Sequence, residues 1–160
     1  MIRPLVTGFM MKKSPRMRKL EEMLRSSVLV VGGFMGDDRR PIMEVIEADG
    51  KALSRLHVTA EQVAQRMQEI TDAAIEGLGT WVKIDDVREA KVEEARGWIP
   101  CPWSDAHRFR KRVTTLRRTD SGQTVQWSDL SIHFIGTHTF FEGKGSFFRI
   151  EPAELVRALF

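Results

Sequence analysis

The feature of this sequence that most restricts its fold is a pair of alternating segments separated by a short polar turn. In residues 108–118, Phe109 and Val113 alternate with arginines, and residues 123–127 show the same period of two after the turn at 119–122. Such alternation places successive side chains on opposite faces, as in a β-strand, and a Thr-Asp-Ser-Gly sequence favours a turn. We therefore predict an antiparallel hairpin here.

Helical spacing dominates the first half of the chain. Ser14 can cap a helix, Pro15 suits its first turn, and apolar residues then recur at helical spacing. The next run, residues 27–31, is short, β-branched and apolar, which is typical of a strand buried on both faces. We therefore predict a helix over about 15–25, followed by a buried strand.

Two further helices are predicted between residues 41 and 77. Apolar residues form one helical stripe over 41–56, and Thr59 and Gln62 have the spacing of a capping box that opens the second helix. Glycines end that helix, the first of them at Gly77. Because only about three residues join the two helices, they should form a helical hairpin or a helix-turn-helix corner.

Two segments fit both a strand and a helix. Residues 85–97 are rich in Glu and Ala but show no apolar stripe, and we favour a strand over 91–98. Residues 130–141 alternate like a strand, yet Asp129 could cap a helix there, so the assignment stays open. The remaining predicted elements are strands over 81–84 and 146–150 and a helix that begins at Pro152.

These patterns predict a single α+β domain over residues 1–160, with a mixed or antiparallel sheet, an N-terminal helix, a helical hairpin at about 41–77 and a short C-terminal helix. Hydrophobic residues make up 42% of the chain. A chain of this length buries roughly 70% of the surface that its unfolded form exposes, so its core needs no disulfides. The single cysteine, Cys101, could form none within the chain.

The sequence also predicts a cytoplasmic location and no membrane contact. Residues 1–13 hold a short apolar patch followed by lysines, unlike a secretory signal. No apolar run approaches the roughly 20 residues of a membrane span, and one unpaired thiol suits a reducing compartment. Phenylalanine pairs at 140–141 and 147–148 suggest an apolar face. We favour its burial under helices, with a homo-oligomer interface as the alternative.

Charge is distributed unevenly, although the net charge is only +3. Residues 1–25 carry +5, residues 26–107 carry −6, residues 108–118 carry +6 and residues 119–160 carry −2. The two basic blocks therefore either pair with the acidic middle of the chain or face an anionic partner.

The basic strand is the leading candidate for a ligand surface. Arg108, Arg110 and Arg112 should project from one side of it. Trp127 lies on the neighbouring strand, and basic residues beside an accessible aromatic ring suit an anionic ligand or nucleic acid. The leading hypothesis is thus a small non-enzymatic binding domain. Further basic candidates are Lys12, Lys13 and Arg16, and the acidic residues that could instead neutralise the strand are Asp85, Asp86, Glu89, Glu93 and Glu94.

A competing hypothesis is an enzyme centred on Cys101. Prolines stiffen the backbone on both sides of this residue, His107 could serve as its base, and Asp105 could orient that base. A thiol becomes reactive at neutral pH only where a cation or base favours the thiolate. The opposing interpretation is that Cys101 is a small buried hydrophobic residue, as free cysteines usually are.

His133 and His138 raise the question of a metal site. With Cys101 and His107 they form a conceivable ligand set, but structural zinc sites usually show a ligand pair on both sides of a loop, and only one pair has that spacing here. Residues five apart point to opposite faces of a strand and diverge on a helix. We therefore predict no metal and no cofactor, with both histidines packed beside aromatic residues.

Two glycine-containing loops, at 32–41 and 143–146, show part of the pattern of a phosphate-binding loop. The first lacks the Gly-Lys-Ser/Thr ending, and Asp37 and Asp38 would repel a phosphate. The second is a comparably incomplete match. We predict that the glycines serve to give the backbone the freedom to turn.

Residues 53–63 resemble the middle of a DNA-binding helix-turn-helix, with a leucine, a turn, a valine, a threonine cap and a further valine. The resemblance implies a recognition helix that enters the major groove. His57 replaces the usual turn glycine, and Leu53 replaces a small residue. Acidic residues dominate the second helix, which a nucleic acid backbone would repel. The charged residues of this helix are Glu61, Glu69, Asp72, Glu76 and Arg66.

Overall fold

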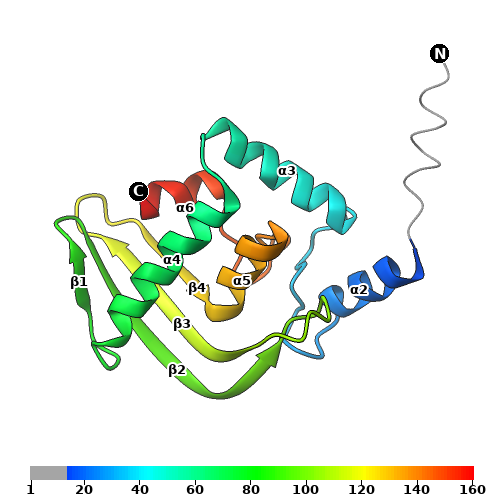
Figure 1. Cartoon of the computed structure of the whole chain (residues 1–160), viewed down its shortest axis with the longest axis horizontal. Helices are drawn as coiled ribbons and strands as arrows, with labels where there is room; N and C mark the ends of the chain where they lie inside the picture. Colours follow the sequence, from blue (N-terminus) through cyan, green and yellow to red (C-terminus); the bar gives the residue numbers. More distant parts are fainter. Residues whose placement is uncertain (1–13) are drawn as a thin grey trace.

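The predicted hairpin forms the last two strands of a four-stranded antiparallel sheet in the computed structural model, which describes residues 14–160 (Figure 1). Successive strands are neighbours across the sheet, in the order β1-β2-β3-β4. In the hairpin, Leu116 lies opposite Val125. The strands are β1 (Val82–Asp85), β2 (Arg88–Pro100), β3 (Arg108–Arg118) and β4 (Thr124–Ser128). The hairpin prediction is confirmed.

The predicted helix starts are confirmed by their caps. The Ser14 hydroxyl accepts a hydrogen bond from the Met17 N–H, and Thr59 and Gln62 form the expected capping box. The helices of the described residues are α2 (Pro15–Arg25), α3 (Ile42–Arg55), α4 (Ala60–Ile75), α5 (Asp129–His138) and α6 (Pro152–Leu159). Within residues 14–160, no helix has both the length and the apolar character needed to cross a bilayer.

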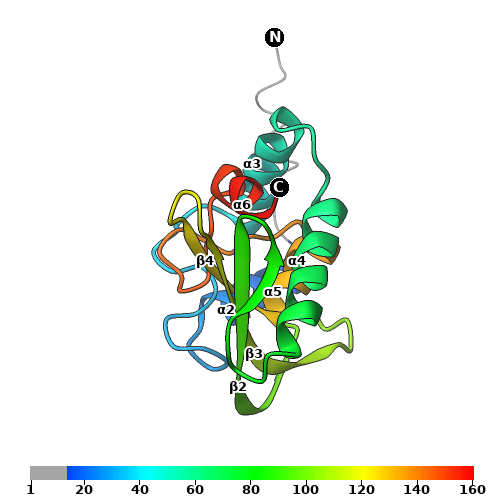
Figure 2. The same cartoon turned by 90° about the vertical axis from the view of Figure 1, so that its left-hand side faces the viewer.

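Helices α4 and α5 lie on the same face of the sheet (Figure 2). Trp127 from β4 is fully buried beneath them, and its indole Nε1–H donates to the Thr71 hydroxyl of α4 at 2.9 Å. Thr71 also shares a 2.7 Å hydrogen bond with Thr114 of β3. The opposite face is polar, since Lys91 of β2 alternates with buried neighbours and lies over the Trp81 ring. The sheet thus has one buried and one open face.

Helix α5 lies between two hydrophobic clusters, and this position explains why its sequence fitted two structures. Ile132 and Ile135 belong to the cluster shared with α4 and the sheet, whereas Leu130 and Phe134 belong to the cluster shared with α2 and α3. A helix buried on both sides has no single apolar stripe. In the other open segment, 85–97, residues 88–97 belong to β2, which pairs with β1 and β3 on its two sides, so the strand favoured over 91–98 is confirmed.

Two predicted strands are wrong. Residues 27–31 form turns, and Val28 and Val31 are 76% and 96% exposed. Residues 146–150 also form turns and irregular backbone. Neither segment pairs with a strand of the sheet, and an apolar run without hydrogen-bonding partners does not hold an extended conformation. The predicted burial holds for Phe140 and Phe141 and fails for Phe147, which is 80% exposed.

The junction of α3 and α4 is a corner and not a closely packed hairpin. After the turn, α4 lies on the sheet, while α3 packs against α6 (Figure 1). His57 adopts the left-handed conformation, with φ of 58°, that a glycine usually supplies in a helix-turn-helix. The acidic residues of α4 are exposed, so this face would repel DNA, as its charge indicates.

The two glycine-containing loops pack against each other. The Gly143 N–H donates to the Phe34 carbonyl at 2.9 Å, and the Asp37 N–H donates to the Lys144 carbonyl at 3.0 Å. A Cβ atom on Gly143 would lie 2.2 Å from the Met35 carbonyl oxygen. Close approach of two backbones is therefore the reason for glycine here, beyond the turning freedom that we predicted.

Glu142, beside this junction, gives the fold a pH-dependent component. The side chain is buried and accepts a 2.7 Å hydrogen bond from the Ser146 hydroxyl, and burial raises its pKa from 4.5 to about 7 although Arg149 opposes the shift. A raised folded-state pKa means that the protonated acid stabilises the fold. This contribution is complete below pH 4.5 and is lost as the pH rises to about 7.

We expect Glu142→Gln to remove this dependence, because an amide keeps the acceptor for Ser146 but carries no charge. At pH 8 the variant should be more stable than the wild type by about 3 kcal/mol, and below pH 4.5 the two should converge. Urea unfolding at a series of pH values measures the difference. A difference that stays constant from pH 4 to pH 8 would show that Glu142 does not titrate abnormally.

Candidate metal centre

The loop between β2 and β3 turns its side chains toward α5. The Cys101 N–H donates to the His107 carbonyl at 2.9 Å and closes the base of the loop, and the Ser104 N–H donates to the Cys101 carbonyl at 3.2 Å. Ser104 and Ala106 have φ of 58° and 65°, a conformation that costs non-glycine residues energy. Such strained backbone is often found at functional sites, which makes this loop a candidate functional segment.

Two imidazoles of α5 converge on one carboxylate of this loop. Nε2 of His133 lies 2.8 Å from Oδ2 of Asp105, and Nε2 of His138 lies 3.0 Å from the same oxygen. Trp103 stacks on His138 with ring centroids 4.1 Å apart, and Phe109 packs 4.8 Å from the His133 ring. Aromatic packing therefore fixes the direction of both imidazoles.

The Cys101 thiol completes the cluster. Its Sγ lies 3.7 Å from Nε2 of His138, and one donor atom each from Cys101, Asp105, His133 and His138 all lie within 4.8 Å of one another. The cluster is close to the surface but mostly covered: Cys101 is 5% exposed, and the side chains of His133 and His138 are 9% and 14% exposed. We call these four residues the Cys-Asp-His-His cluster.

The cluster holds one strongly ionised group and one strongly protonated group. Burial disfavours the charged form of Asp105, but hydrogen bonds from His133 and His138 outweigh it and hold the pKa of the carboxyl below its usual range. Burial, helped by the Asp105 carboxylate, raises the pKa of the Cys101 thiol to about 12. Burial also lowers the pKa of His138. By itself the cluster therefore keeps the sulfur protonated and poorly nucleophilic.

The predicted catalytic residues come together only in part. Cys101 and Asp105 are neighbours, but the imidazole beside the sulfur belongs to His138. His107 contacts Oδ1 of Asp105 through Nδ1 at 3.3 Å, and its side chain is 61% exposed. In a relay, the sulfur and the carboxylate would contact opposite nitrogens of one ring. Here both contact Nε2 of His138, an arrangement that suits a shared cation better than a relay.

Only some of the predicted ligand-binding residues share one surface. Nη1 of Arg110 pairs with Glu94 at 3.0 Å, and Nε of Arg112 pairs with Asp129 at 2.7 Å. Trp127 is in the core under α4, so its ring is not accessible to a ligand. The prediction of an accessible ring is therefore wrong. Lys12 and Lys13 lie outside the described residues, so that part of the prediction has no structural counterpart. Arg108 remains at the surface.

Three of the four metal-ligand candidates in the sequence, Cys101, His133 and His138, belong to the cluster. The fourth candidate, His107, does not, and Asp105 stands in its place. A metal site was not predicted because only one pair has the usual spacing and residues five apart on a helix diverge. His138 is the last residue of α5, and Thr139 turns into the left-handed conformation. The two imidazoles can still meet because the 101–107 loop brings one small acceptor between them. The available signal was the pairing of Cys-x3-Asp with His-x4-His.

We compared the chain with protein-family models, with curated proteins and with solved structures, and none of the three comparisons finds a match. The residues and geometry of the Cys-Asp-His-His cluster are therefore the basis for inferring a function.

Proposed function

We propose that this protein binds a divalent transition-metal ion, with zinc the best fit, through Cys101, Asp105, His133 and His138. The observation that carries the proposal is the convergence of one thiol, one carboxylate oxygen and two imidazole nitrogens within 4.8 Å of one another. Sulfur, nitrogen and carboxylate oxygen are the donors that zinc accepts in proteins. Softer metals favour sites made of sulfur donors, and harder metals favour sites made of oxygen donors.

The donor atoms lie close to the spacing of a tetrahedral site but not yet at it. Zinc bonds of about 2.0 to 2.3 Å place neighbouring donors roughly 3.3 to 3.8 Å apart. The 3.7 Å contact between Sγ of Cys101 and Nε2 of His138 falls in this range, whereas the 2.8 and 3.0 Å contacts of the two imidazoles with Asp105 are hydrogen-bond distances that an ion would lengthen. An ion at the centre would replace the hydrogen bonds to Asp105 and would release the Cys101 proton to solvent. With Nε2 bound to the ion, His133 would carry its proton on Nδ1 instead, which lies 3.3 Å from an acceptor, the Thr137 hydroxyl.

The arrangement favours a structural role for the metal. Four protein donors fill a tetrahedral coordination shell, whereas a catalytic zinc keeps one position for water or substrate. The donors come from the loop after β2 and from α5, which are separate in sequence. The ion would therefore hold the strained loop against the helix and shape the adjoining surface.

The test is a titration of the purified, reduced protein with Co²⁺, which reports its own coordination. We expect one ion per chain, a sulfur-to-cobalt charge-transfer band and intense visible bands typical of tetrahedral cobalt. Zinc should then displace cobalt because it binds nitrogen and sulfur donors more tightly. Cys101→Ser should lose the charge-transfer band, and His138→Gln should weaken binding by at least about 100-fold.

Two histidines outside the cluster provide the matched controls. His57 lies in the turn between α3 and α4, and His57→Asn should bind cobalt as the wild type does. His107→Gln should retain the charge-transfer band and the stoichiometry. If Cys101→Ser and His138→Gln bind with wild-type affinity, or if no tetrahedral spectrum appears, the cluster is not a metal site.

A further inference from the structure

The far end of the β2–β3 ribbon carries an exposed aromatic ring with two guanidinium groups close to it. The pairing register shifts between Ala95 and Trp98, so that residues 96–97 form a bulge. Bulges re-aim the side chains next to them, and Trp98 here is 49% exposed. The guanidinium carbons of Arg108 and Arg110 each lie 5.0 Å from the centroid of this ring.

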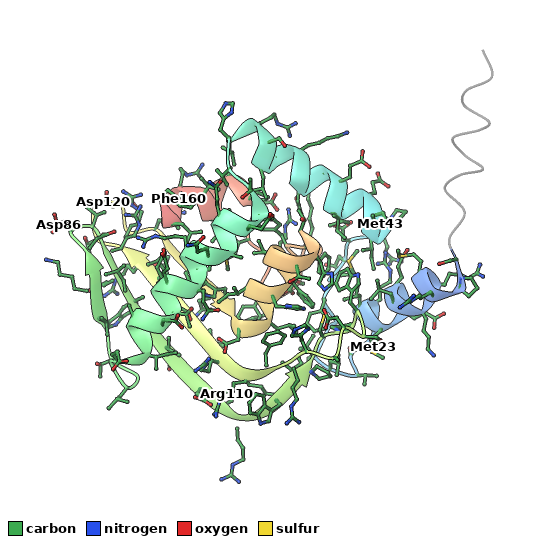
Figure 3. The ribbon with its side chains drawn as sticks, in the orientation of Figure 1. Met23, Met43, Asp86, Arg110, Asp120 and Phe160 are labelled. Carbon is green, nitrogen blue, oxygen red and sulfur yellow. The ribbon has the colours of Figure 1, made fainter. Side chains whose placement is uncertain are left out.

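The cations around Trp98 are only partly neutralised. Arg110 pairs with Glu94, and Figure 3 shows Arg110 at the bend of the β2–β3 ribbon, on the side away from the helices. Among residues 14–160, no carboxylate forms an ion pair with Arg96, Arg108 or Lys111, and all three are exposed. Lys111 lies beside the bulge, with its Nζ 4.0 Å from the position of a Cβ on Gly97. The surface therefore has unpaired positive charge around a flat apolar ring.

We propose that this surface, defined as Arg96, Trp98, Arg108, Arg110 and Lys111, binds single-stranded nucleic acid. A base would stack on Trp98, and the cations would contact phosphates, the combination that sequence-independent single-strand binding uses. An acidic polypeptide would use the charges but would gain little from an exposed indole. The proposal is independent of the metal site, since it shares no residue with the Cys-Asp-His-His cluster.

A second tryptophan on the sheet supplies an internal comparison. The Arg117 guanidinium carbon lies 4.0 Å from the Trp81 ring centroid, but Arg117 pairs with Glu89 through two nitrogens. Lys91, the other cation over the Trp81 ring, pairs with Glu93 at 3.6 Å. Trp81 thus has similar cations over its ring, but both are neutralised. If charge and ring must act together, Trp98 binds a base and Trp81 does not.

The experiment measures binding of a fluorescently labelled oligothymidylate to the full chain by anisotropy. Trp98→Ala should weaken binding about 10-fold or more, Trp98→Phe should retain most of the affinity, and Trp81→Ala should leave it unchanged. With three to four phosphate contacts, the plot of log affinity against log salt should have a slope of about −2 to −3. Arg108→Ala should make that slope shallower by about one contact.

Three results would overturn the proposal: no binding at low salt, an affinity that ignores salt, or equal effects of Trp98→Ala and Trp81→Ala. Polyglutamate competing as well as the oligonucleotide, with Trp98→Ala without effect, would assign the surface to an acidic protein instead. Circular dichroism of each variant checks that it is folded. Cobalt binding is read from its visible spectrum and oligonucleotide binding from anisotropy, so failure of the metal proposal and failure of this one give different results.

Discussion

Zinc is expected to raise the free energy of unfolding of the wild-type protein by about 4 kcal/mol when the free ion exceeds its dissociation constant 1,000-fold. The increase follows from linkage, because the folded chain brings the four donors within 4.8 Å whereas the unfolded chain separates Cys101 from His138 by 37 residues. Urea unfolding followed by circular dichroism, with zinc buffered in one series and chelated in the other, measures the difference.

Variants of the cluster separate this effect from non-specific binding. Cys101→Ser and His138→Gln should lose most of the zinc-dependent increment, while His57→Asn should retain it, since His57 lies in the turn after α3. In the chelated series, Cys101→Ser should lose some stability, because a hydroxyl replaces a thiol buried in a hydrophobic cluster, and this loss, unlike that of the increment, should be the same with zinc. Equal urea midpoints with zinc and with chelator in the wild type would contradict the proposed site.

Much of the fold could be predicted because its signals are local. Helix caps lie within three residues of the groups they bond, as at Ser14 and Thr59, and strand alternation is complete within each strand. The errors occurred where tertiary contacts decide the structure. Residues 27–31 have the composition of a strand but no partner strand, and α5 shows no stripe because both its sides are buried.

The candidate site could be predicted less well than the fold. Its residue types were visible, but the distances between them depend on where the loop after β2 meets α5, across 28 residues from Asp105 to His133. His133 and His138 are five residues apart, and in an isolated helix this spacing makes the two side chains diverge, which argues against shared ligation. The left-handed Ser104 and Ala106, which shape the loop, have no signature in the sequence.

The contact between the two glycine-containing loops could not be predicted either, because a close backbone contact produces no pattern in the sequence of either segment alone. Gly143→Ala is expected to destabilise the protein by at least about 3 kcal/mol. The new Cβ would lie 2.2 Å from the Met35 carbonyl oxygen and 2.7 Å from the Met35 Cα. Because both atoms are backbone, no rotamer change can relieve the clash, and separating the loops would break the hydrogen bond from Gly143 to Phe34.

Gly50→Ala is the matched control for this substitution, with the opposite expected sign. Gly50 lies inside α3, where an added Cβ would meet only the Thr139 methyl group at 3.9 Å. Alanine should therefore stabilise the helix by about 0.5 to 1 kcal/mol. Urea midpoints of the two variants, measured beside the wild type, should fall on either side of it. A Gly143→Ala protein within about 1 kcal/mol of the wild type would mean that the two loops can separate at little cost, and that their contact does not hold Glu142 in its buried position.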